Sequence, residues 1–202
     1  ANAVATINTD STVSVQVVRF GSSASTIVSS TVIDSQATLD GVVAAISGMG
    51  YTGGLTCYSC AFNAATAGLG FGADDTTLVN MMTDGSPTTG GDGVAQRNAL
   101  VAAGADIISF EAINLNASTT AFLKDSLAYP QPGVVAPPYP DPITSNGWVT
   151  PVSGFGDIET ALKQKFIAGG IAPPTTVPEP GSLLLLGLGM AGLAGLRKKR
   201  AS

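Results

Sequence analysis

Strand-like and helix-like segments alternate along this chain, and this alternation constrains the fold more than any other feature. Valines alternate with polar residues over 12–22, and a second β-rich stretch over 25–34 follows a Gly-Ser-Ser turn, as in a hairpin. Apolar residues then recur at helical spacing up to Gly48 and again between Ala61 and Leu69. Further strands are expected over 77–82, 106–110 and 147–152, with helices over 94–103, 119–127 and 157–166 between and after them. This order predicts a doubly wound α/β sheet.

Two other features of the body are assigned to the surface. The proline-rich segment 130–146 is too irregular for a helix or a strand, so we expect a long surface loop there. Glu111, Asp74 and Asp75 are interpreted as surface or turn acids. One domain is expected over 1–168, because 202 residues supply one full hydrophobic core but not two and a tail.

Charge and histidine content exclude several classes of function. Charged residues make up 11% of the chain, against roughly 25% in typical soluble proteins. Four of the nine bases lie within 197–200, so five bases face fourteen acids in the rest of the chain. An acidic body repels phosphate backbones, so no nucleic-acid partner is expected. The absence of histidine removes imidazole bases, Ser-His-Asp systems and most zinc sites, and no enzymatic activity is expected.

The C-terminal segment combines three features in a fixed order. Pro178, Glu179 and Pro180 form an extended, accessible tripeptide. An uncharged apolar run over 183–196 follows, shorter than the ~20 residues that span a bilayer comfortably. The segment ends with a basic cluster that should remain cytoplasmic, formed by Arg197, Lys198, Lys199 and Arg200.

Residues 177–202 therefore resemble the PEP-CTERM sorting signal of Gram-negative bacteria, and 169–176 form a Pro/Thr linker before it. The resemblance implies recognition by a membrane-embedded exosortase, transient anchoring in the inner membrane through an apolar helix, and cleavage near Pro-Glu-Pro. It also implies an exported protein of the cell envelope, outer surface or extracellular space, often in biofilm-forming cells. A plain single-pass anchor is the alternative, and the shortness of the apolar run argues against it.

Two loops offer oxygen ligands where strands of such a sheet end. In Gly53-Gly54-Leu55-Thr56 the glycines permit tight backbone geometry, and Thr56 presents a hydroxyl at the start of the next helix. In Thr83-Asp84-Gly85 a carboxylate follows a hydrophobic strand. A hydroxyl and a carboxylate at one edge suit a hard cation such as Mg²⁺, with water or a partner carboxylate completing its shell.

These loops, in this order, resemble the von Willebrand factor type A (VWA) domain. The resemblance covers residues 1–168 and implies a metal-ion-dependent adhesion site (MIDAS) in which Thr56 and Asp84 hold Mg²⁺, Mn²⁺ or Ca²⁺. The family's first loop, Asp-x-Ser-x-Ser, does not occur in this sequence. The domain is therefore expected to lack its first strand and most of its first helix, with the N-terminus truncated. The alternative is that Thr56 only caps a helix and Asp84 only starts a turn.

Cys57 and Cys60 are the only cysteines, at Cys-x-x-Cys spacing. Two thiolates alone cannot close a tetrahedral metal site. In an oxidising envelope a local disulfide is preferred over a thioredoxin-like thiol pair.

The leading hypothesis is an exported binding or adhesion protein whose cation bridges to an acidic group on a protein or matrix ligand. The first alternative is a structural surface or matrix protein with a non-functional metal site. The second is a thiol-disulfide enzyme that uses Cys57 and Cys60.

Overall fold

The computed structural model describes residues 4–10, 12–50, 54–68, 70, 76–130, 134–135 and 147–168. The linker 169–176 and the sorting segment 177–202 lie outside these ranges, and so do Asp74, Asp75 and most of the proline-rich segment. No helix within the described ranges is long and apolar enough to cross a membrane. The apolar helix expected over 183–196 lies outside them.

The strands and helices follow one another in the expected order. The strands are β1 (Ser14–Phe20), β2 (Ala24–Val32), β3 (Leu78–Thr83), β4 (Ile107–Ile113), β5 (Val134–Val135) and β6 (Trp148–Val152). The α-helices are α1 (Gln36–Ser47), α2 (Tyr58–Gly68), α3 (Val94–Ala102), α4 (Ala117–Phe122) and α5 (Ile158–Ala168). Short helical segments are η1 (Val4–Thr6), the π-helical η2 (Leu123–Leu127) and η4 (Phe155–Asp157). The expectation that segment 130–146 contains no regular element is wrong at β5.

The strands form two sheets. β3, β4, β6 and β5 form a parallel sheet in that order, and β1 and β2 form a separate antiparallel hairpin. Parallel strands connected by helices are the expected α/β architecture. The division into two sheets is a difference from the single doubly wound sheet that the sequence predicts.

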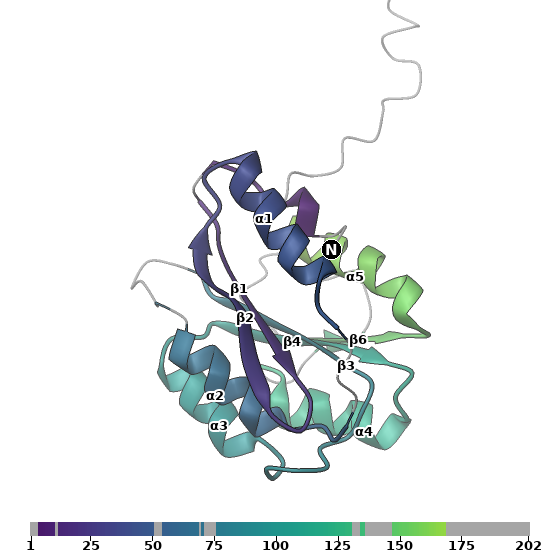
Figure 1. Cartoon of the computed structure of the whole chain (residues 1–202). Helices are drawn as coiled ribbons and strands as arrows, with labels where there is room; N and C mark the ends of the chain where they lie inside the picture. The colour runs from purple at the N-terminus through teal and green to yellow at the C-terminus, as the bar shows by residue number, and fades with distance from the viewer. Residues whose placement is uncertain are drawn as a thin grey trace, which may run out of the picture.

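Helices cover both faces of the strands (Figure 1): α1 and α5 lie on one side, and α2, α3 and α4 on the other. Every residue of β4 is buried, as expected for a strand between two helical layers. Successive side chains of β4 alternate between the layers, so that Phe110 belongs to the α2–α3 core and Ile113 packs with Ala161 of α5. The sequence therefore buries both faces of its central strand.

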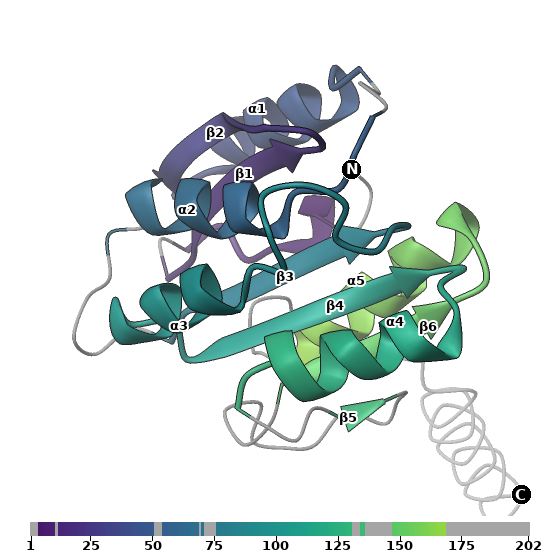
Figure 2. The ribbon, with the colours of Figure 1, turned by 90° about the horizontal axis from the view of Figure 1, so that it is seen from below.

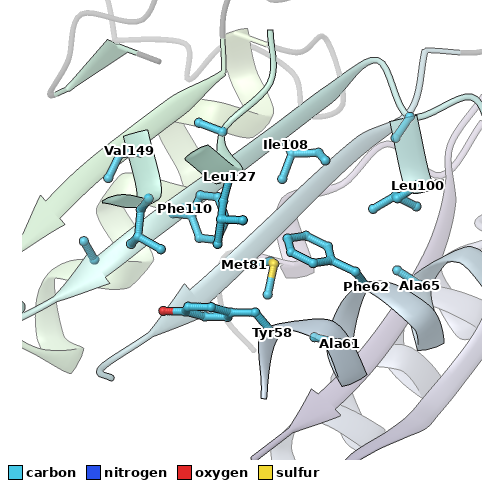
Figure 3. Close-up of a cluster of buried hydrophobic side chains, with 14 residues drawn as sticks. Tyr58, Ala61, Phe62, Ala65, Met81, Leu100, Ile108, Phe110, Leu127 and Val149 are labelled. Atoms are coloured by element: carbon cyan, nitrogen blue, oxygen red, sulfur yellow. The ribbon is translucent and has the colours of Figure 1, made fainter. Parts of the chain in front are cut away.

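The main core lies between the parallel sheet and the α2–α3 layer. Figure 3 shows Tyr58 and Phe62 of α2 pointing toward Met81 of β3 and Phe110 of β4. Tyr58 and Phe110 meet edge to face with their ring centroids 6.3 Å apart. Burying aromatic side chains of this size is the largest favourable contribution to such a core.

A second core joins α1 to the hairpin. The Ser35 side chain caps α1 by accepting a hydrogen bond from the Thr38 amide at 3.2 Å. Leu39 and Val42 of α1 then pack against Ile33, which follows β2. Phe166 of α5 also contacts this cluster, so the two helices of this layer share it.

The expectation that Glu111 is a surface or turn acid is wrong, because this residue is fully buried. β4 continues three residues beyond the expected end at Phe110, which places Glu111 inside the sheet. Its carboxylate pairs with Lys165 of α5 at 2.6 Å. A charge is buried only when it is paired, and the sequence alone does not show a partner so far along the chain.

Candidate cation site at the carboxyl end of β3

The candidate site lies where β3 ends and α2 begins. Thr83 is the last residue of β3 and is buried, whereas the next residue, Asp84, is exposed. Thr56 is half-buried and lies two residues before the first residue of α2. The two predicted ligands therefore come from two loops at one edge of the structure, the edge at which α/β sheets bind ligands.

Close packing brings these loops together. Thr56 donates its amide to Thr88 Oγ1 at 2.7 Å, and its carbonyl accepts from the Thr88 amide at 2.9 Å. A β-carbon on Gly85 would lie only 2.4 Å from Thr56 Oγ1. The Thr56 hydroxyl is thus packed against the residue that directly follows Asp84.

Tyr58, the first residue of α2, connects the same two loops through its hydroxyl group. Its hydroxyl donates to the Gly85 carbonyl at 2.5 Å and contacts the Thr83 hydroxyl at 3.1 Å. Burial raises the pKa of Tyr58 to about 12; the hydrogen bond with Thr83 opposes this shift, and the negative charge of Asp84 adds to it. The neutral phenol therefore holds the turn, and the charge on Asp84 lies near enough to act on it.

The hairpin turn supports the Thr56 loop from the other side. Leu55 donates its amide to Ser22 Oγ at 3.0 Å, and Cys57 donates its amide to the Gly21 carbonyl at 2.9 Å. Gly54 has φ +103°, and a β-carbon there would lie 2.7 Å from Ser22 Oγ, so glycine is required. Gly53 lies outside the described residues.

The site presents hard oxygen donors. The Asp84 carboxylate and the Thr56 hydroxyl are the predicted ligands, and the Ser86 and Thr119 hydroxyls pair with each other nearby at 2.6 Å. Within the described residues there is no group of three or more His, Cys, Asp or Glu side chains that could hold a metal. A cation bound here would rely on few protein ligands together with water or a partner's oxygen.

A disulfide joins Cys57, the residue before α2, to Cys60 in the first turn of that helix. Cys57 is buried, with 1% of its surface exposed. A β-carbon on Gly90 would lie 2.6 Å from Cys57 Sγ, so the loop after β3 covers this sulfur. The disulfide therefore lies against the same loop that carries Asp84.

Sequence reasoning missed a second polar cluster, on the opposite face of the sheet. Lys165 of α5 contacts Glu111 Oε1 at 2.6 Å and donates to Asn80 Oδ1 of β3 at 3.0 Å. Asn80 in turn donates to Glu111 Oε2 at 2.6 Å and accepts from Ser109 Oγ at 2.7 Å. Burial lowers the pKa of Lys165, and the nearby Glu111 carboxylate opposes this shift. The sequence does contain one signal for this cluster. Lys165 lies three residues after Leu162, on the inward face of the last helix, where a lysine needs a buried partner.

Comparisons with known proteins support the tail and the fold separately. Residues 176–200 match the family model described as the PEP-CTERM protein-sorting motif. No curated protein matches the chain. Two crystal forms of proximal thread matrix protein 1 (PTMP1) from the mussel byssus are structurally similar at 18% identity, with TM-scores of 0.57 and 0.61 over 76% and 83% of this chain. The chain spans only 35% and 40% of those proteins.

These matches establish two points about the chain. Its C-terminal segment is a PEP-CTERM sorting motif, as the sequence predicts, which implies an exported protein sorted by an exosortase at the cell surface. Its body has an α/β fold similar to part of a thread matrix protein.

Proposed function

We propose that the chain is a non-enzymatic surface or extracellular-matrix binding protein with a VWA-type body, and that Thr56 and Asp84 hold a divalent cation. The cation bridges to an acidic group on a protein or matrix ligand. The observation that carries this proposal is the packing of the Thr56 hydroxyl against Gly85, next to the exposed carboxylate of Asp84. Affinity for the ligand comes from completing the coordination shell of the cation.

The fold and the tail support a matrix or adhesion role. The sorting motif implies delivery to the surface, where such a protein would meet its ligand. The structurally similar mussel protein is named as a thread matrix protein, which agrees with this role.

The donor chemistry fits Mg²⁺ or Mn²⁺. Mg²⁺ keeps several waters and is commonly held by one or two carboxylates together with groups of the bound partner. Asp84 supplies one exposed carboxylate, and Thr56 supplies a hydroxyl. The bound cation would polarise and bind the partner's carboxylate, while the protein side chains fix its position.

Calorimetric titration of the full chain with Mn²⁺ tests this assignment. Asp84→Ala should weaken binding at least about tenfold, because it removes the only charged ligand of the proposed site. Asp40→Ala is the matched control, since Asp40 is an exposed acid on α1 that hydrogen-bonds Gln36 at 2.8 Å. Equal Mn²⁺ affinity in the three proteins would reject the site.

A structural matrix protein without a working cation site is the second candidate. One observation favours it: both backbone groups of Thr56 bind Thr88, so Thr56 has a structural role without any metal. In that case neither Mg²⁺ nor Mn²⁺ would bind measurably, and adding either ion would leave the thermal stability of wild type and of Asp84→Ala unchanged.

The thiol-disulfide alternative is less compatible with the geometry. Exchange requires a thiolate to reach a disulfide sulfur; Cys57 is buried beneath the loop that carries Gly90, and only Cys60 is partly exposed. Mass spectrometry after mild reductant should show the Cys57–Cys60 disulfide intact. Rapid reduction of the folded protein would instead favour the thiol-exchange role.

A further inference from the structure

The buried cluster behind the sheet combines the groups required for an amide-forming reaction. Lys165 carries an amine, Asn80 carries a carboxamide, and Glu111 contacts both nitrogen atoms through its two oxygens, at 2.6 Å in each case. Lys165 and Glu111 are both fully buried. Figure 2 shows the elements that bring them together: α5 lies behind β3 and β4, on the side opposite α2 and α3.

We propose that Lys165 and Asn80 become joined by an intramolecular isopeptide bond, formed by the folded chain itself with release of ammonia. Glu111 transfers the protons, and Ser109 stabilises the charge that develops on Asn80 Oδ1. The bond links β3 to α5 across 85 residues of sequence. This proposal does not depend on the cation site.

Distance favours the reaction. Lys165 Nζ lies 3.0 Å from Asn80 Oδ1. Because a C=O bond is about 1.2 Å long, the carboxamide carbon lies no more than about 4.2 Å from the amine. Reacting atoms approach to about 3–3.5 Å before bond formation, so a small rotation of either side chain brings the amine over the carbonyl carbon.

Burial favours the neutral amine of Lys165, which is the nucleophile of the reaction. An amine attacks only in its neutral form, and the pKa of Lys165 is lowered because burial disfavours its charge. Its proton passes to the Glu111 carboxylate across the 2.6 Å contact. The product of this transfer is a neutral amine beside a neutral carboxylic acid, which suits a site without solvent.

The reaction balances without an external reagent. The Lys165 Nζ lone pair forms a bond to Asn80 Cγ, and negative charge moves to Oδ1, which accepts a hydrogen bond from Ser109 Oγ at 2.7 Å. Glu111 accepts a second proton equivalent from Nζ as it donates one to Nδ2. The Cγ–Nδ2 bond then breaks and ammonia leaves. An ammonium, a carboxylate and a carboxamide thus become a secondary amide, ammonia and a carboxylic acid.

The position of the bond suits a protein attached through its C-terminus. α5 ends at Ala168, immediately before the linker 169–176 and the sorting motif. A force applied to the tail would first act on α5. A covalent bond from Lys165 to β3 would pass that force to the parallel sheet rather than unwinding the last helix.

Mass spectrometry of the full chain, with its tail and after complete reduction, tests the proposal. Wild type should weigh about 17 Da less than its sequence mass, the loss of one ammonia expected for amide formation by Lys165. Digestion should yield a branched peptide that joins the residue 80 and residue 165 segments. The branch matters because Asn146 precedes Gly147, and a succinimide there would also lose ammonia without a branch.

Two variants complete the experiment. Glu111→Gln should show the full sequence mass and no branched peptide. Lys163→Arg, on the same helix but paired with Glu159 at its surface, should retain the branch. If Glu111→Gln fails to fold, the wild-type digest still decides. Folded wild type with the full sequence mass, or with ammonia lost only outside the 80–165 branch, overturns the proposal.

Discussion

Substitution of Gly85 by alanine probes the contact between the two loops of the proposed cation site. The new β-carbon would lie 2.4 Å from Thr56 Oγ1, well inside van der Waals contact. Overpacking of this kind costs about 1–3 kcal/mol, because the loops must separate or the Thr56 side chain must move. Gly85→Ala should therefore lower the free energy of unfolding by that amount.

Thr56→Ala removes the atom responsible for the clash. In this background Gly85→Ala should cost clearly less, and the two substitutions should couple by at least about 0.5 kcal/mol in a double-mutant cycle. Urea denaturation of the four proteins measures the cycle. Gly41→Ala is the control, because nothing lies within 4 Å of a β-carbon there; in mid-helix it should stabilise by about 0.5–1 kcal/mol. Additivity of the Gly85 and Thr56 changes would refute the contact.

Three further predictions concern the core, the buried phenol and the disulfide. Phe62→Ala should cost about 3–5 kcal/mol in urea denaturation, because Phe62 is fully buried. The stability contributed by neutral Tyr58 is present below its ordinary pKa of 10.0 and is lost as pH rises toward 12; this loss should disappear in Tyr58→Phe, and ultraviolet titration of wild type should show a late-ionising tyrosine that is missing from this variant. Replacing both Cys57 and Cys60 by alanine should cost about 2 kcal/mol, measured by thermal unfolding, since the closed loop is short.

The sequence predicted the order of the elements because each carries its own local signal. Ser35 and Gly48 bound α1, and the periodicity of Val13, Val15 and Val17 marks the first strand. The pairing of the strands could not be predicted in the same way. The separation of the hairpin from the parallel sheet depends on long-range hydrogen bonds, which local periodicity does not encode.

The two polar clusters differ in how well the sequence predicts them. Asp84 was found because it follows an apolar strand and precedes glycine, a local pattern. Glu111 was misassigned because a lone acid at the expected end of a strand is typical of a surface position. Its burial depends on Lys165 and Asn80, which lie 54 positions later and 31 positions earlier, and no local pattern connects these residues.

The central functional claim is that a divalent cation binds between Thr56 and Asp84. Backbone amide NMR of the full chain during addition of substoichiometric Mn²⁺ tests it most directly, because the paramagnetic ion broadens the signals of nearby residues. The amides of Thr56, Gly85 and Thr88 should broaden first, and Mg²⁺ in excess should restore them. Broadening centred on other acids, or uniform broadening across the chain, would contradict it.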